Sequence, residues 1–123
     1  MILVDTSVWI SFLRKDDPDH VDILKSYLKR QEVYAISAVF GELLQGVKNK
    51  REQDVIGILW ESLPKLPEDG LFLEAGLLSK NHKFFAHGIG LIDCYILSAA
   101  IKHKLALWTL DKKLAKAAEM VFS

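Results

Sequence analysis

Short apolar runs alternate along this chain with longer segments in which apolar residues recur at helical spacing. The short runs predict buried strands, and the periodic segments predict helices. We expect strands at Ile2–Val4, Val33–Ile36 and Leu105–Thr109, with Met120–Phe122 as a candidate edge strand. Strands that alternate with helices favour an α/β fold, in which helices cover both faces of a mainly parallel sheet.

Capping residues and chain breaks indicate where the helices begin and end. Asp17 and Pro18 open one helix and Ser37 can cap another, while the polar stretch 48–51 marks a turn or bend. The segment Leu91–Ile101 has almost no polar side, so it belongs in the interior. The expected helices start near Ser7, at Pro18, at Ser37, around Val55–Trp60, at Leu71 (to Phe85), at Leu91 (to Ile101) and at Asp111.

Composition fits a single domain over residues 1–123, since half of the 123 residues are hydrophobic. Sixteen basic and sixteen acidic residues cancel, so any basic surface must be local. The single cysteine, Cys94, excludes an internal disulfide and indicates a reducing compartment. The apolar start is interrupted by Asp5 and resembles neither a signal peptide nor a membrane span. We therefore expect a cytoplasmic protein without a membrane partner.

Two of the expected strands end at a threonine and a carboxylate. Asp5 and Thr6 follow the first strand, and the strand expected at Leu105–Thr109 ends at Thr109, two residues before Asp111. Parallel strands end at one edge of a sheet, where such folds place their ligands. Clustered carboxylates repel one another unless a cation lies between them, and Mg²⁺ or Mn²⁺ prefers oxygen ligands. The pattern predicts a metal site at this edge.

Each carboxylate also has a simpler interpretation. Asp5 and Asp111 could cap the helices that follow them, and Glu42 lies off the apolar stripe of its helix, which is typical of a solvated side chain. Asp93 stands among apolar residues. The dipole of its helix favours an anion by only about 0.3–1 kcal/mol, too little to offset desolvation, so we expect a cation or a hydrogen-bonding partner.

If these carboxylates converge, they can hold one or two metal ions, with nearby hydroxyl groups as further ligands or donors. Metal ions held in this way generate hydroxide from water and stabilise both oxygens of a phosphodiester displacement. The four histidines lack ligand spacing, which argues against zinc. The supporting hydroxyl groups belong to Thr6, Ser7 and Thr109.

Four segments in this order carry a family resemblance: Val4-Asp5-Thr6-Ser7-Val8-Trp9, Ser37 with Gly41-Glu42-Leu43-Leu44-Gln45-Gly46, Gly90-Leu91-Ile92-Asp93-Cys94-Tyr95-Ile96, and Leu107-Trp108-Thr109-Leu110-Asp111. Over nearly its whole length the chain resembles the PIN-domain ribonucleases, and among them the VapC toxins of toxin–antitoxin pairs. The resemblance implies an α/β/α sandwich and endonucleolytic cleavage of RNA with Mg²⁺ or Mn²⁺. It also implies a homodimer and inhibition by a cognate antitoxin.

By position, the resemblance assigns catalytic roles to four carboxylates and replaces the solvated interpretation of Glu42. Asp5, Asp93 and Asp111 would bind metal, and Thr6 and Thr109 match the family's hydroxyl positions. Many relatives carry a further acidic residue directly after the position of Asp111, where this chain has two lysines. The resemblance thus leaves open whether one or two ions bind. The acidic quartet is Asp5, Glu42, Asp93 and Asp111.

An acidic site that holds a polyanion needs basic residues at its margin. We expect selective cleavage of unpaired loops, because the net charge is zero and an RNA duplex hides its bases. The antitoxin would place a basic side chain among the carboxylates. The alternatives are a non-catalytic binding module and a phosphoacceptor domain, although the latter predicts an acidic pair after the first strand. The candidate RNA-binding residues are Arg14, Lys15, Lys48, Lys50, Arg51, Lys112 and Lys113.

Overall fold

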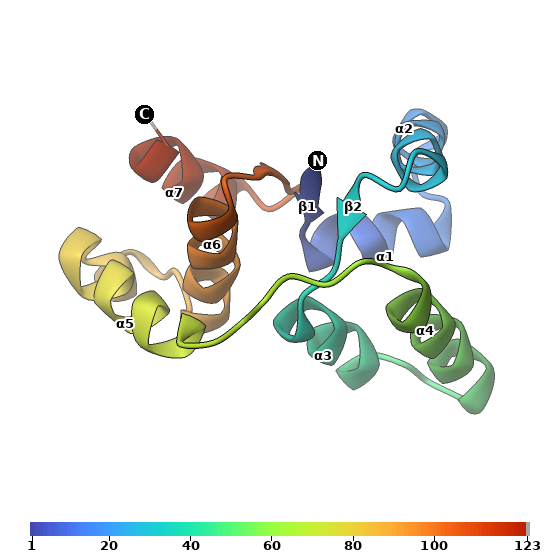
Figure 1. Ribbon diagram of the computed structural model, residues 1–123, viewed down its shortest axis with the longest axis horizontal. Helices are drawn as coiled ribbons and strands as arrows, with labels where there is room; N and C mark the ends of the chain where they lie inside the picture. The colour runs from blue at the N-terminus through green and yellow to red at the C-terminus, as the bar shows by residue number, and fades with distance from the viewer. Residues whose placement is uncertain (123) are drawn as a thin grey trace.

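The computed structural model describes residues 1–122, which form a small parallel sheet and its surrounding helices (Figure 1). The sheet has the order β2-β1-β3, and both pairings are parallel. The elements follow one another as β1 (Ile2–Val4), α1 (Thr6–Arg14), α2 (Pro18–Lys29), β2 (Val33–Tyr34), α3 (Ser37–Gln45), α4 (Lys50–Ser62), α5 (Leu71–His82), the 3₁₀ turn η1 (Phe84–His87), α6 (Leu91–His103), β3 (Ala106–Trp108) and α7 (Lys112–Phe122).

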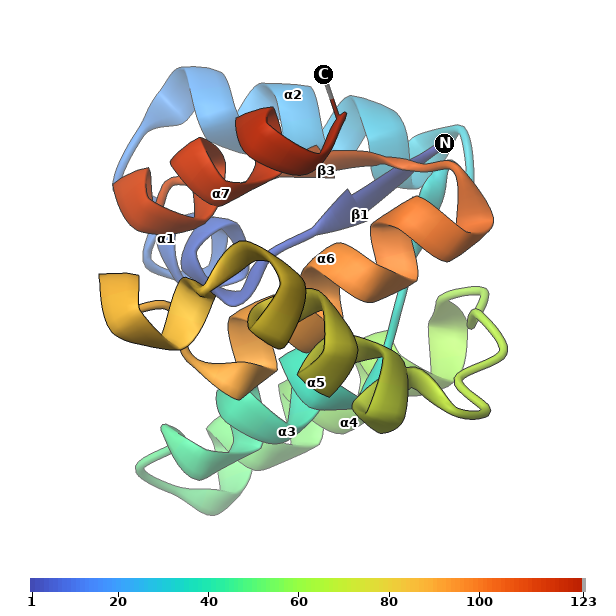
Figure 2. The same ribbon diagram turned by 90° about the vertical axis from the view of Figure 1, so that its left-hand side faces the viewer.

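Helices cover the sheet on both sides, which confirms the predicted α/β architecture. Figure 1 shows α6 and α7 on one side of β1 and β2, with α1 and α2 on the other. Helix α5 packs outside α6, and Figure 2 shows it in front of α6 when the molecule is viewed from that side. No helix within residues 1–122 is long and apolar enough to cross a bilayer.

The core lies between the sheet and its helices. Residues 94–100 of α6 are all buried, as its lack of a polar side predicts, and Cys94 is one of them. Trp9 is fully buried, with its ring edge-on to the rings of Phe12 and Phe40. Trp60 and Trp108 are partly buried against the same core. All three tryptophans therefore act as packing residues.

Several predicted boundaries are wrong for local reasons. Met120–Phe122 is not an edge strand but the end of α7, whose apolar residues have helical spacing. The helix expected over 71–85 stops at His82, because Lys83 adopts a left-handed conformation (φ 56°) and η1 follows. Strand β2 ends at Tyr34, since Ala35 forms a bridge to Lys65 instead.

Two helix starts also differ from the prediction. Helix α4 begins at Lys50, inside the expected turn, because the Asn49 side chain accepts a hydrogen bond from the backbone N–H of Glu52 at 2.9 Å. Ser37 does not cap α3. It is the first residue of that helix, and the cap position is held by Ile36, which has no polar side chain.

Candidate active site at the carboxyl ends of strands β1 and β3

The parallel pairing of β1 with β3 brings the two ends of the sequence together. Val4 is in register with Trp108, and the backbone N–H of Asp5 continues the ladder by donating to the Trp108 carbonyl at 2.9 Å. Asp5 and Thr109 therefore leave the sheet side by side, although more than a hundred residues separate them in sequence. The predicted convergence of the strand ends is present in the structure.

Asp5 is the buried centre of this cluster, with 4 % of its surface exposed. Its Oδ2 accepts hydrogen bonds from the Ser7 hydroxyl at 2.7 Å and the Thr109 hydroxyl at 2.8 Å. The same oxygen caps α1 by a longer bond of 3.4 Å from the backbone N–H of Ser7. The capping and clustering interpretations of Asp5 are thus both correct.

The loop after β3 is closed onto α1 through these hydroxyl groups. The backbone N–H of Leu110 donates to the Ser7 hydroxyl at 2.9 Å, and that of Asp111 donates to Thr109 Oγ1 at 3.0 Å. Asp111 then caps α7, because its Oδ1 accepts the backbone N–H groups of Lys113 and Leu114 at 2.8 and 3.2 Å. This fixed loop holds an exposed Asp111 carboxylate beside the strand ends.

Glu42 joins the cluster from α3. Thr6 donates its hydroxyl to Glu42 Oε1 at 2.7 Å, which links the first turn of α1 to the middle of α3. The Glu42 side chain is half-buried, so the solvated position suggested by the helical wheel is wrong. Thr6 serves Glu42, whereas Ser7 and Thr109 serve Asp5.

Asp93, in the first turn of α6, lies within the field of the other three carboxylates. Its pKa is raised from 3.8 to about 6, first by burial and then by the negative charges of Asp111, Asp5 and Glu42. A backbone hydrogen bond at Gly90 opposes this rise. Three carboxylates from separate parts of the sequence therefore lie near enough to Asp93 for their charges to act on it.

The donor set of this site fits a hard divalent cation. It offers carboxylate and hydroxyl oxygens, and its negative charges crowd closely enough to raise the pKa of Asp93. Within residues 1–122, no three acidic, histidine or cysteine side chains are already gathered as ligands around one point. In this arrangement, hydroxyl groups hold the Asp5 and Glu42 carboxylates.

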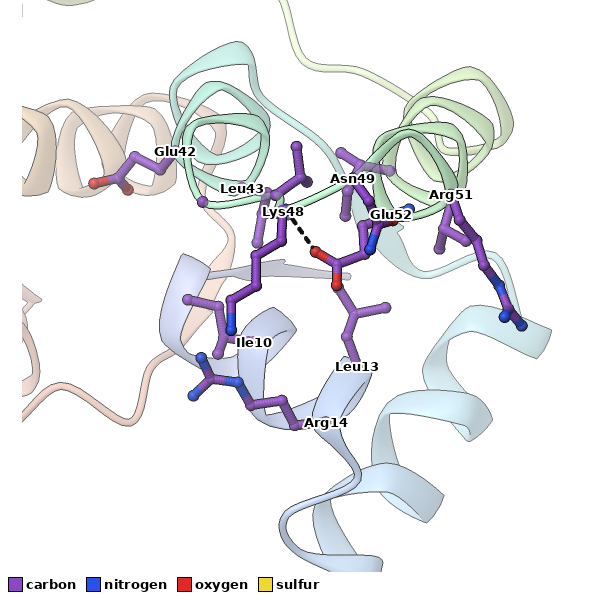
Figure 3. A pocket seen from close by; sticks show the side chains of 13 residues that line it. Ile10, Leu13, Arg14, Glu42, Leu43, Lys48, Asn49, Arg51 and Glu52 are labelled. Atoms are coloured by element: carbon purple, nitrogen blue, oxygen red, sulfur yellow. Dashed lines mark hydrogen bonds between the residues drawn. The ribbon is translucent and has the colours of Figure 1, made fainter.

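A groove of about 530 Å³ lies between α1, α3 and α4, and Glu42 lines it together with basic residues. Three of the predicted RNA-binding residues, Arg14, Lys48 and Arg51, line this groove. Figure 3 shows Arg14 and Lys48 extending to the same side, near Ile10, while Arg51 points away from them. Basic side chains and one carboxylate of the site therefore border the same groove.

The other predicted basic residues lie elsewhere. Lys50 pairs with Asp54 at 3.0 Å on the exposed face of α4, and Lys15 follows the end of α1 in a left-handed conformation. Lys112 and Lys113 form the exposed first turn of α7. These four residues do not line the groove.

The groove itself was not predicted from the sequence. Its apolar lining includes Ile10 and Leu13, which remain 36 % and 38 % exposed on α1. The available signal was that the apolar residues of α1 extend beyond the one face that packs on the core, where Val8 and Trp9 are buried. Such an excess of apolar positions is typical of a contact surface.

Comparison with known proteins agrees with this architecture. The family model of the PIN domain matches residues 2–120. Two relatives, each named Ribonuclease VapC32, come from the CDC 1551 / Oshkosh and H37Rv strains of Mycobacterium tuberculosis. Each is 32% identical over 120 residues, which are 95% of this chain and 90% of the relative.

A solved structure shares the fold. The crystal structure of FitAcB from Neisseria gonorrhoeae superposes with a TM-score of 0.62 and 24% sequence identity. The match covers 97% of this chain and 94% of the other. Nearly the whole described chain therefore follows a fold already known from experiment.

Proposed function

This chain belongs to the PIN-domain family, and from that premise we propose that it is a metal-dependent endoribonuclease, the toxin of a VapBC-type toxin–antitoxin pair. The observation that carries the proposal is the convergence of Asp5, Glu42, Asp93 and Asp111 at one edge of the sheet. The identity to two proteins named ribonucleases supports RNA as the substrate.

In this proposal the chain's own residues bind and orient the reacting groups. Asp5, Asp93 and Asp111 supply the carboxylates that would hold Mg²⁺ or Mn²⁺, while Ser7 and Thr109 keep Asp5 oriented by their hydroxyl groups. A bound ion would supply a water of lowered pKa and balance the charge of the phosphodiester. Glu42, held by Thr6, would accept a proton or orient that water.

The test uses a circular single-stranded RNA, which an exonuclease cannot attack. We expect the purified protein to linearise it in the presence of Mg²⁺ or Mn²⁺, and EDTA to stop the reaction. Mapping of the cut sites on total bacterial RNA should show a few preferred, unpaired positions. An intact circle in both metals would disprove the proposed activity, and cuts spread evenly over all transcripts would disprove the selectivity.

We place the RNA strand in the groove beside Glu42. Arg14 and Lys48 can neutralise phosphates there, and the apolar lining of α1 and α4 can contact unpaired bases. The groove leads to the carboxylates because Glu42 borders both. The rest of the surface lacks a general positive field, since the formal net charge is zero.

Replacing both Arg14 and Lys48 with alanine should weaken RNA binding about 20-fold at 0.1 M salt. Each phosphate contact that is lost reduces the magnitude of the slope of log K against log salt concentration by about 0.7. The slope itself should fall by about 1.4. Lys50→Ala is the matched control, since Lys50 pairs with Asp54 outside the groove. Fluorescence anisotropy with a labelled single strand measures both quantities. An equal loss of RNA affinity in the control and in the double variant would show that RNA does not bind in this groove.

The remaining partners follow from the family and stay predictions. We propose a homodimer and a cognate antitoxin that inserts a basic side chain among the carboxylates, where an uncompensated acidic site attracts a cation. Helix α5 exposes Phe72, Leu73 and Leu77, an apolar surface that a second copy could cover. An enzyme that cuts cellular RNA would act in the cytoplasm.

The alternatives are less well supported. A phosphoacceptor domain needs an acidic pair after its first strand, but Thr6 follows Asp5 and donates to Glu42. A non-catalytic module would not need four carboxylates crowded enough to raise the pKa of Asp93. The endoribonuclease is therefore the function that the site supports best.

A further inference from the structure

The start of α3 is capped by a residue from a distant loop. Glu68, between α4 and α5, accepts the backbone N–H of Ser37 at 3.0 Å on Oε1 and 3.1 Å on Oε2. The Ser37 hydroxyl also donates to Glu68 Oε1, at 2.7 Å. A carboxylate at this position satisfies an otherwise unpaired helix donor and interacts favourably with the helix dipole.

The same carboxylate is bound by α6. The hydroxyl of Tyr95, a residue only 4 % exposed, donates to Glu68 Oε1 at 2.7 Å. The buried position of Tyr95 shields this hydrogen bond from water. Hydrogen bonds to an ionised acceptor are about twice as strong as those between neutral groups. Glu68 therefore links α3 to α6.

These two helices carry half of the acidic quartet. Glu42 lies five residues after Ser37 in α3, a distance of about 7.5 Å along the helix axis. Asp93 lies two residues before Tyr95 in α6. If α3 moved relative to α6 at Glu68, the distance between the Glu42 and Asp93 carboxylates would change.

Glu68 is itself held in place by the chain around it. The segment before it runs along Ala35, whose N–H donates to the Pro64 carbonyl at 2.8 Å and whose carbonyl accepts from Leu66 at 3.3 Å. The Glu68 carbonyl accepts the backbone N–H of Leu71 at the start of α5. A fixed backbone on this side makes the Glu68 carboxylate a rigid link between the helices.

We propose that Glu68 is a positioning residue, whose hydrogen bonds to Ser37 and Tyr95 set the distance between Glu42 and Asp93, the latter being the one of the two that would hold the divalent ion. This inference rests on the proposed metal-dependent function. It assigns Glu68 no contact with the ion or with RNA. Mutation of a group that orients the ligands of a metal site commonly lowers metal affinity or activity by about 10- to 100-fold.

The experiment titrates the RNA-free protein with Mn²⁺ and follows the free ion by electron paramagnetic resonance. We expect Glu68→Gln to weaken Mn²⁺ binding about tenfold, because the amide keeps the shape but loses the charge that holds Ser37 and Tyr95. The kcat at low Mn²⁺ should fall by a similar factor and recover at high Mn²⁺, while the KM for RNA stays unchanged. Glu74→Gln is the matched control, since it breaks the α5–α6 ion pair of Glu74 with Lys102, at 3.2 Å, and leaves α3 untouched.

Tyr95→Phe gives a second, milder variant if Glu68→Gln does not fold. It removes the hydrogen bonds of the Tyr95 hydroxyl to Glu68 and Ser37 but keeps the Glu68 carboxylate. It should weaken Mn²⁺ binding about threefold, with the circular dichroism spectrum unchanged. Wild-type Mn²⁺ affinity in a folded Glu68→Gln or Tyr95→Phe protein would overturn the positioning role. Failure of the wild-type protein to bind Mn²⁺ and to cut RNA would instead overturn the proposed function, so the two failures are distinguishable.

Discussion

Replacing Asp93 with asparagine is expected to lower metal-dependent RNA cleavage at least about a hundredfold while the protein stays folded. Asparagine keeps the shape of the side chain and removes its charge. Burial and the negative charges of the other three carboxylates raise the pKa of Asp93 to about 6. A charge kept in so unfavourable a setting is typical of a functional group, because nothing in the packing of α6 requires it.

Initial rates of cleavage of a circular RNA at saturating Mn²⁺ measure this effect, and circular dichroism checks the fold. Asp22→Asn is the control, since Asp22 is an exposed aspartate on α2. The control should cut like the wild-type protein. A folded Asp93→Asn protein that cuts at the wild-type rate would show that the acidic cluster is not the catalytic site.

The sequence predicts those residues of the candidate site whose positions are determined by the end of a strand. Asp5 and Thr109 each follow an apolar run, and parallel strands necessarily place such residues at one edge. Asp93 was identified by a local contradiction, a carboxylate inside an apolar helix. Glu42 gave no local signal of its own, because its place in the site depends on how α3 packs beside Thr6.

The features that the sequence did not predict depend on contacts between distant segments. Glu68 looks like any acidic loop residue until the loop is placed beside Ser37, 31 positions earlier. The misplaced cap of α3 has the same origin, because a side chain from elsewhere can cap a helix as well as a local serine. Helix α5 ends at His82 because Lys83 has a positive φ angle, and a lysine in the sequence does not predict such a conformation.

The Asp93→Asn substitution is also expected to stabilise the metal-free protein above pH 6. The Asp93 pKa is near its ordinary 3.8 in the unfolded chain and about 6 in the folded one, so between these values the folded state binds more protons. The free energy of unfolding therefore falls as the pH rises through this window. Asp93→Asn carries no such proton and escapes this loss, so its melting temperature should exceed that of the wild type by several degrees at pH 7.5 and match it near pH 3.5.

Addition of Mg²⁺ or Mn²⁺ at pH 7.5 should reverse this order. An ion that binds only the folded state raises the melting temperature, and the rise increases with the logarithm of the ratio of its concentration to Kd. The ion also offsets the repulsion among the wild-type carboxylates. The wild-type protein should gain stability and Asp93→Asn should gain little. Melting curves recorded with EDTA and with each metal, at both pH values, give all the required differences. A wild type more stable than Asp93→Asn in EDTA at pH 7.5 would mean that the carboxylates do not repel one another as their positions imply.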